Sequence, residues 1–227
     1  KLMEYHVSKT GNDAALGIKD QPFLTISRAA QVAVAGDVVV VHAGVYREWV
    51  NPLNGGTEDA RIVYQSAGDG EVMITGAEQV KDWKNAGGKV WTAEVDNSIF
   101  THRNPFKEDL CGDWLFKGPF VPHLGDVFLN GKSLYEAESV EKLQNPEAWE
   151  LAKYAEDSKL VWYAEAGEKT TKFWANFGDA DPREENIEIS VRPFCFWPEK
   201  TGLNYITVKG FTICQASPQW APPTALQ

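Results

Sequence analysis

The chain has 227 residues, of which 43% are hydrophobic and 24% charged, as in an ordinary soluble globular protein. Its formal net charge of −10 argues against nucleic acid and anionic membranes as partners, because phosphate binding needs clustered Lys and Arg. No stretch of the sequence approaches the ~18 apolar residues of a membrane span. The three cysteines, Cys111, Cys195 and Cys214, are widely spaced, so we expect buried free thiols and neither a disulfide framework, a metal site nor another cofactor.

The first part of the chain predicts a strand, a helix and a buried strand. Tyr5–Ser8 is a short strand that ends in a turn cluster, and a helix is expected from Thr25 to Ala35, ended by Gly36. The apolar residues expected to form one face of that helix are Ile26, Ala29, Ala30 and Val34. The β-branched run Val38–His42 is typical of a strand buried on both faces, as parallel strands are. We therefore expect the helix to cap the open end of a parallel stack.

Short strands and tight turns follow in a repeating order. Gly44–Glu48 is expected to turn the chain, and Arg61–Gln65 and Glu71–Gly76 are two more short strands. The pattern G-D-x-V-x-V-x-x-G-x-Y, which begins at Gly36 and ends at Tyr46, resembles the pectin-lyase-like right-handed parallel β-helix proteins. That resemblance implies the fold and says little about activity, because one fold hosts many functions.

The middle of the chain has a different character, with strands that alternate apolar and polar residues. These strands are Val90–Val95, Asp126–Asn130, Leu160–Glu165, Thr171–Phe177 and Asn186–Val191. Alternation gives one dry face and one wet face, which predicts an antiparallel sandwich. A second helix is expected at Pro146–Tyr154. The residues around Asn204–Ile213, with a bend at Gly210, return to the earlier style.

The predicted fold class is therefore all-β: a right-handed parallel β-helix with an N-terminal cap helix, interrupted by an inserted antiparallel β-sandwich. The expected domains are the first coils at 1–77, the sandwich at 78–192 and the return to the β-helix at 193–227.

Four stretches resemble glycoside hydrolase family 120, the β-xylosidase family. They are Gly112–Leu115, His123–Gly131, Ala175–Phe177 and Trp220–Thr224, and the likeness runs over essentially the whole chain. The resemblance implies a retaining hydrolase that releases xylose from the non-reducing end of xylo-oligosaccharides, with an Asp nucleophile and a Glu acid/base. It also implies that both carboxylates lie downstream of Gln227, so no catalytic residue is assigned in this chain.

Two further expectations concern the extent of the chain and its location in the cell. We expect a fragment that stops in mid-coil and has the remainder of its own polypeptide as a partner, since an uncapped repeat is seldom stable alone. With Lys1-Leu2 taken as a remnant before the native start, we expect no signal peptide and a cytoplasmic location. Homo-oligomerisation is left open.

Aromatic residues are the best candidates for sugar contacts, because flat rings pack on the C–H faces of pyranoses. Trp91, Trp162 and Trp174 lie on alternating strands and are expected inside the sandwich. Trp114, beside Asp113 in an irregular Gly- and Pro-rich stretch, is the predicted sugar platform. The predicted substrate-binding residues are Trp114, Asp113, His123 and Trp220, each with packing as the alternative role.

Two other functions remain open at this stage. A non-catalytic carbohydrate-binding or adhesin-like β-helix would explain the tryptophans equally well. A polysaccharide lyase shares the solenoid, but it binds acidic polymer through calcium and a basic residue, which the acidic charge balance does not favour.

Overall fold

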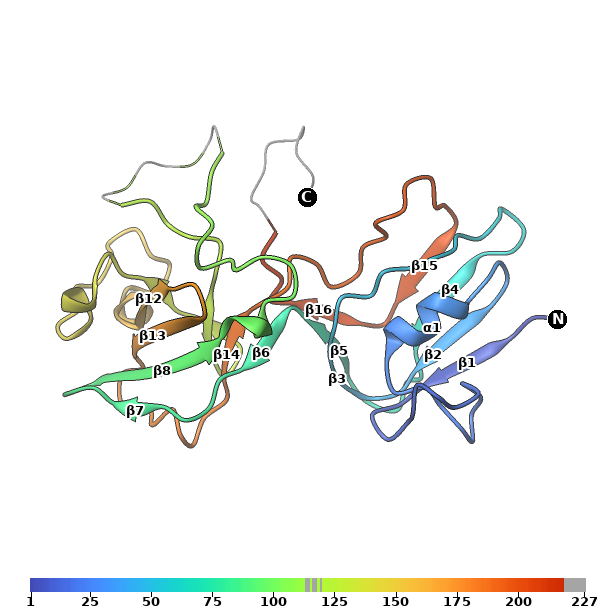
Figure 1. The fold of residues 1–227 in the computed structure, drawn as a ribbon, viewed down its shortest axis with the longest axis horizontal. Helices are drawn as coiled ribbons and strands as arrows, with labels where there is room; N and C mark the ends of the chain where they lie inside the picture. The colour runs from blue at the N-terminus through green and yellow to red at the C-terminus, as the bar shows by residue number, and fades with distance from the viewer. Residues whose placement is uncertain (113–114, 116–117, 119, 219–227) are drawn as a thin grey trace. The chain divides into compact units, whose positions relative to one another are not determined.

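The computed structural model describes residues 1–112, 115, 118 and 120–218 of the chain (Figure 1). The described chain divides into two compact units. The first unit, called the coil unit below, comprises Lys1–Gly76 and Phe194–Ala216. The second, called the insertion unit, is formed mainly by Ala77–Pro193.

The coil unit contains two parallel sheets whose strands alternate along the chain. The first sheet has the order β1-β2-β4-β15, formed by Glu4–Val7, Val38–Val41, Ile62–Ser66 and Ile206–Lys209. The second has the order β16-β5-β3, formed by Thr212–Cys214, Val72–Thr75 and Gly44–Arg47. Each strand of the first sheet from β2 onward is followed by a strand of the second, so the chain repeats the same two-strand unit at successive levels.

The core of the coil unit lies between these sheets and the helix. Its fully buried members include Val39, Tyr46, Tyr64 and Ile74, contributed by both sheets. The uninterrupted valines of β2 fit this place, because three of the four are buried. The bend predicted at Gly210 is confirmed, with φ +82° between β15 and β16.

The helix α1 spans Ile26–Val32 and lies alongside the first sheet (Figure 1). Thr25 caps its N-terminus, accepting a hydrogen bond from the Arg28 N–H through its hydroxyl. Glu48 adds a second cap, because its carboxylate accepts from the N–H and the hydroxyl of Ser27, both at 2.6 Å. Ile26, Ala29 and Ala30 are buried, as the predicted apolar face requires.

The expected end of this helix was wrong. It ends at Val32, with Ala33 as its C-cap, rather than at Ala35 before Gly36, and Val34 is 52% exposed instead of facing the strands. The buried carboxylate of Asp37 accepts from the N–H of Val34 at 2.9 Å, while Leu53 donates to the Ala30 carbonyl that Val34 would otherwise bond. The last helical turn is thus replaced by contacts to later residues.

The insertion unit contains two sheets in which most neighbours are antiparallel. One sheet has the order β10-β9-β14-β6, formed by Lys132–Ser133, Val127–Leu129, Ile187–Ser190 and Ala77–Gln79. The other has the order β11-β12-β13-β8-β7, formed by Tyr135–Glu136, Val161–Ala166, Thr170–Asn176, Val90–Asp96 and Lys84–Asn85. Only the pairing of β11 with β12 is parallel among these named strands.

The two sheets of the insertion unit share one core, which gives it a sandwich-like arrangement. Val127 and Ile189 come from one sheet, and Phe173 and Ala175 from the other. Trp162 is buried in this core at 2% exposure, as expected, whereas Trp91 and Trp174 are only half-buried. Short 3₁₀ turns lie outside the sheets at Asn97–Ile99, Val140–Leu143 and Ala155–Lys159.

Three further expectations are corrected by the structure. Gly44–Arg47 is the strand β3 and not a turn, because its backbone pairs with β5. Residues 146–154 form no helix; Trp149 and Leu151 are 51% and 74% exposed, so no surface covers the apolar face a helix would need. Of the three cysteines expected to be buried, only Cys195 is; Cys111 is exposed and Cys214 is half-buried.

No helix among the described residues is long and apolar enough to cross a bilayer.

Candidate functional site

His123 is the one predicted site residue that lies among the described residues. It forms an isolated antiparallel bridge with Asp109, and the Leu110 N–H donates to the Pro122 carbonyl at 2.8 Å. The predicted residues Asp113, Trp114 and Trp220 lie outside the described residues.

Glu136 of β11 holds His123 through both carboxylate oxygens. The backbone N–H of His123 donates to Oε1 at 2.7 Å, and its ring Nδ1 lies 2.7 Å from Oε2. While Glu136 is ionised it can only accept, so the ring then carries a proton on Nδ1 and its orientation is fixed. Nε2, the other ring nitrogen, lies 3.7 Å from Asp109 Oδ1. The His123 side chain remains 33% exposed, so Nε2 is the nitrogen available to a ligand hydroxyl.

The electrostatics of Glu136 reflect its burial. Its side chain is 11% exposed, and desolvation raises the pKa of this carboxyl above its usual range. The hydrogen bonds from His123 oppose that rise, and the negative charge of Asp109 adds to it. Glu136 thus takes up a proton more readily than an ordinary surface glutamate.

Asp126, just before β9, is a second perturbed acid of the same cluster. Burial raises the pKa of this carboxyl to about 6, and the charge of Glu136 contributes in the same direction. Hydrogen bonds to it from the Ser133 hydroxyl and the Val127 N–H act in the opposite sense. Groups that change charge near neutral pH are over-represented at functional sites, although structural networks produce them too.

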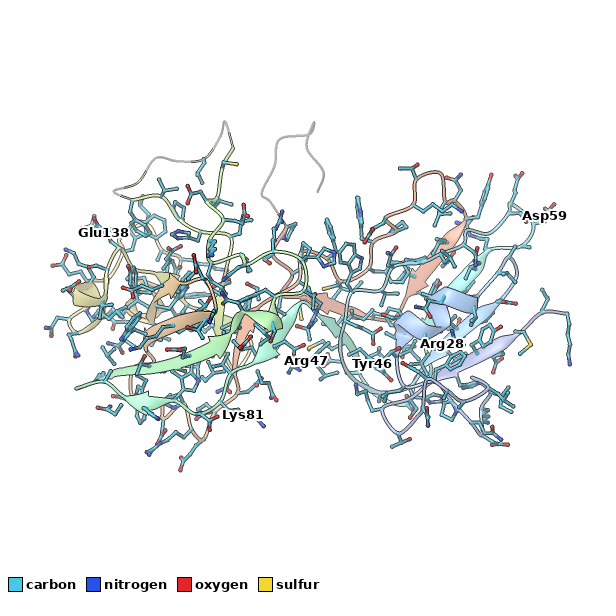
Figure 2. The ribbon with its side chains drawn as sticks, in the orientation of Figure 1. Arg28, Tyr46, Arg47, Asp59, Lys81 and Glu138 are labelled. Carbon is cyan, nitrogen blue, oxygen red and sulfur yellow. The ribbon has the colours of Figure 1, made fainter. Side chains whose placement is uncertain are left out.

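The insertion unit also has open grooves on its surface. One of about 580 Å³ is lined by residues that include Lys81, Trp83 and Arg183, and another of about 470 Å³ by residues that include Gln144 and Asn176. Neither groove is lined by His123. Figure 2 shows Lys81 at the surface of the unit. The grooves and the His123 cluster are therefore separate features.

Sequence reasoning missed the partners of His123. Glu136 lies 13 residues further along the chain and Asp109 precedes the irregular segment, so no local spacing marks the three as one cluster. Asp126 was expected only as part of a strand. Across the described residues, no three His, Cys, Asp or Glu side chains are grouped so that they could hold a metal ion.

Two protein families match separate parts of the chain. Residues 80–189 match the family described as glycoside hydrolase 120, insertion domain. Residues 9–52 match a family described as a protein of unknown function, DUF1565. An uncharacterised protein of Bacillus subtilis (strain 168), YwoF, is 32% identical over 71 residues, which is 31% of this chain and 15% of that protein.

Solved structures extend the similarity over nearly all of the chain. XylC, solved in complex with xylose, is 48% identical and superposes with a TM-score of 0.93 over 99% of this chain. A structure described as a glycoside hydrolase has 15% identity, a TM-score of 0.60, and coverage of 94% of this chain and 51% of its own; at that identity it supports the fold alone.

The chain spans 37% of the length of XylC, so XylC contains a large part that has no counterpart here. Within the part that is shared, the insertion-domain match and the likeness to XylC agree. Residues 80–189 therefore form a glycoside hydrolase 120 insertion domain, and the chain as a whole is similar to XylC.

Proposed function

We propose that this chain is part of a retaining β-xylosidase that releases xylose from the non-reducing end of xylo-oligosaccharides. The observation that carries the proposal is the similarity to XylC, which is 48% identical and binds xylose in its solved structure. The insertion-domain match at residues 80–189 supports the same family of enzymes.

The catalytic carboxylates are proposed to lie outside these 227 residues. A retaining mechanism needs two carboxyl groups about 5–5.5 Å apart on either side of the glycosidic bond. Asp126 and Glu136 are the described acids of the insertion unit whose pKa is raised by burial, but both are engaged by neighbours, Asp126 by Ser133 and Glu136 by His123. They are therefore better suited to hold the unit together than to attack a substrate.

We also infer that the coil unit is the beginning of a right-handed parallel β-helix. The support is the regular pairing of its strands, in which β4 pairs with β2 and β15, and β5 pairs with β3 and β16, all in parallel. An enzyme of this kind would carry its remaining coils beyond β16, with the insertion unit between two of its first coils.

The proposal is tested by following xylobiose hydrolysis by NMR with the full-length protein that contains this chain. A retaining hydrolase releases β-xylose first, which then equilibrates with the α form. Initial release of α-xylose would contradict retention, and an unsaturated product would indicate a lyase. Binding of xylo-oligosaccharide without any product would favour the non-catalytic alternative.

Trp114 remains the predicted sugar platform and gives a second test of the proposal. Stacking of a xylose ring on an indole contributes about 1–2 kcal/mol by analogy with other aromatic contacts. In the full-length enzyme, Trp114→Ala is therefore expected to lower kcat/KM by about 5- to 30-fold while the melting temperature stays unchanged.

The matched control for that variant is Trp149→Ala, which removes an exposed indole from the same unit. It should leave kcat/KM unchanged. A drop of several degrees in the melting temperature of Trp114→Ala with normal kinetics would instead identify Trp114 as a packing residue.

A further inference from the structure

Two histidines on neighbouring strands of the first parallel sheet join two carboxylates in one hydrogen-bonded chain. His6 of β1 and His42, which follows β2, place Nδ1 and Nε2 2.9 Å apart, with the ring centroids 5.2 Å apart and the ring planes inclined by 23°. Glu4 Oε1 lies 2.8 Å from His6 Nε2, and Asp69 Oδ2 lies 2.8 Å from His42 Nδ1. All four ring nitrogens therefore have a partner within hydrogen-bonding distance.

The number of protons in this chain follows from its geometry. Each of the three contacts needs one proton, and ionised carboxylates supply none. Two neutral imidazoles carry two N–H groups, which leaves one contact with lone pairs on both sides. Two charged imidazoles carry four, which sets one N–H against another between His6 and His42. The chain is complete only with three ring protons, that is, with one positive charge shared by the two rings.

The burial of the chain is uneven along its length. The ring of His6 is almost buried, with its side chain 6% exposed, whereas the side chains of Glu4 and Asp69 are 64% and 48% exposed. The hydrogen bond from His42, and a further one from the Ala43 N–H, hold the pKa of the Asp69 carboxyl below its usual range. Asp69 is therefore an ionised acceptor and not a source of the third proton.

The elements packed around the chain bring two more titratable groups near it. Tyr46 of β3, labelled in Figure 2, donates its hydroxyl to the His42 carbonyl at 2.7 Å. Lys9, which follows β1, places its ammonium 4.9 Å from the centre of the Tyr46 ring. The pKa of the Tyr46 hydroxyl is raised mainly by burial, so this group stays a neutral donor across the ordinary pH range. The net charge of the hydrogen-bonded chain therefore depends on Glu4, the two imidazole rings and Asp69.

We propose that Glu4, His6, His42 and Asp69 form a proton-binding latch that fastens strand β1 to the next levels of the parallel sheet. The four residues come from β1, from the end of β2 and from the loop after β4, so the latch spans three neighbouring strands. It is closed when the two rings share one proton, and it is weakened when that proton leaves or a second one arrives.

The latch gives the attachment of β1 a bell-shaped dependence on pH. Free imidazoles are mostly neutral above about pH 7.5. The contacts are complete only with three ring protons, so release of the third at high pH leaves one contact with lone pairs on both sides, and the contribution is lost as pH rises. At low pH a fourth ring proton sets one N–H against another between His6 and His42, so the contribution is also lost as pH falls.

The first measurement counts protons and local opening in the wild-type protein. Side-chain ¹⁵N NMR near neutral pH should show three protonated nitrogens among the four of His6 and His42. The protection factor of the His6 N–H, which donates to the Gly17 carbonyl at 2.8 Å, should fall by about tenfold or more on both sides of its maximum. Two ring protons at neutral pH, or a protection factor that does not vary with pH, would overturn the latch.

The decisive variant is Asp69→Asn, because it changes the number of protons and keeps the contacts. Its side-chain oxygen can still accept from the Ala43 N–H, and its amide group can donate to His42 Nδ1. The chain is then complete with two neutral imidazoles, so two ring protons are expected and the loss of protection at high pH should disappear. Glu4→Gln makes the same change at the other, more exposed end and should give the same result.

His102→Gln, which alters an exposed histidine of the insertion unit, is the matched control and should keep the wild-type profile. If Asp69→Asn and Glu4→Gln both fold and both retain the loss of protection at high pH, the proton count is wrong and the proposal fails.

Discussion

Replacement of Phe173 by alanine is expected to lower the free energy of unfolding of the insertion unit by about 3–5 kcal/mol, the usual range for a buried aromatic residue. Phe173 lies in the middle of β13 and is fully buried. Its ring meets the ring of Phe106 edge to face at 4.8 Å. On the flanking strands its partners are Ala93 and Ala164, which are too small to fill the space. The cavity would therefore stay largely open.

The effect can be measured by hydrogen exchange of the β13 amides, with the β2 amides of the coil unit as an internal reference. The protection factors of the β13 amides are expected to fall by an amount that corresponds to the lost free energy of unfolding. Those of the β2 amides should change much less. Phe173→Leu, which keeps most of the volume, is the matched variant and should cost less, about 1.5 kcal/mol. Equal protection of β13 in wild type and Phe173→Ala would show that this ring does not support the core.

Asp126→Asn is expected to make the insertion unit more stable above pH 6 by on the order of 1–2 kcal/mol. The folded-state pKa of Asp126 is about 6, against about 4 for an unfolded aspartate. Because the folded state binds this proton more tightly, the wild type is favoured below pH 4 and loses stability as pH rises from 4 to 6. The neutral amide avoids that loss, and it can keep the contacts with Val127 and Ser133.

Denaturant unfolding at a series of pH values between 4 and 8 measures this difference. The curves of wild type and Asp126→Asn should diverge through the window from pH 4 to pH 6 and run parallel above it. Asp181→Asn is the control of opposite sign, because hydrogen bonds from Arg183 hold the pKa of the Asp181 carboxyl below its usual range. Curves that run parallel over the whole range would mean that Asp126 is not buried enough to retain its proton.

The strands of the insertion unit could be predicted closely from alternation alone. The expected strand at 171–177 is observed at Thr170–Asn176, and the one at 160–165 at Val161–Ala166. These strands bury one face in the sandwich core, so every second side chain must be apolar, and this alternation is visible in the sequence. The register confirms it, since Phe173 and Ala175 point into the same core.

Elements whose structure depends on distant partners could not be predicted in this way. Gly44–Arg47 is too short to show a period, and it is a strand because β5, many residues later, pairs with it. Pro146–Tyr154 has residues that favour a helix, but helical propensity over so few residues is insufficient without a surface to bury one face. The early end of α1 depends on Asp37 and Leu53, which lie outside the helix.

The candidate site shows the same limit. His123 was identifiable because it follows a proline in an irregular stretch, but nothing local indicated that Glu136 would hold it. The two residues meet because the hairpin of β9 and β10 returns the chain to β11. Proton affinities such as that of Asp126 depend on burial, which a sequence pattern does not reveal.

The pairing of β6 with β14 has a consequence for how the chain folds. The ladder from Ala77 opposite Ser190 brings the two ends of the insertion unit together as neighbours. Pairing of β4 with β15, where Ile62 lies opposite Ile206, would otherwise require closure of a very long loop. Once the insertion unit has folded, that loop is effectively a short connection. We therefore expect the insertion unit to reach its native state first, and the coil on either side of it to join afterwards at a rate set by a short loop instead of a long one.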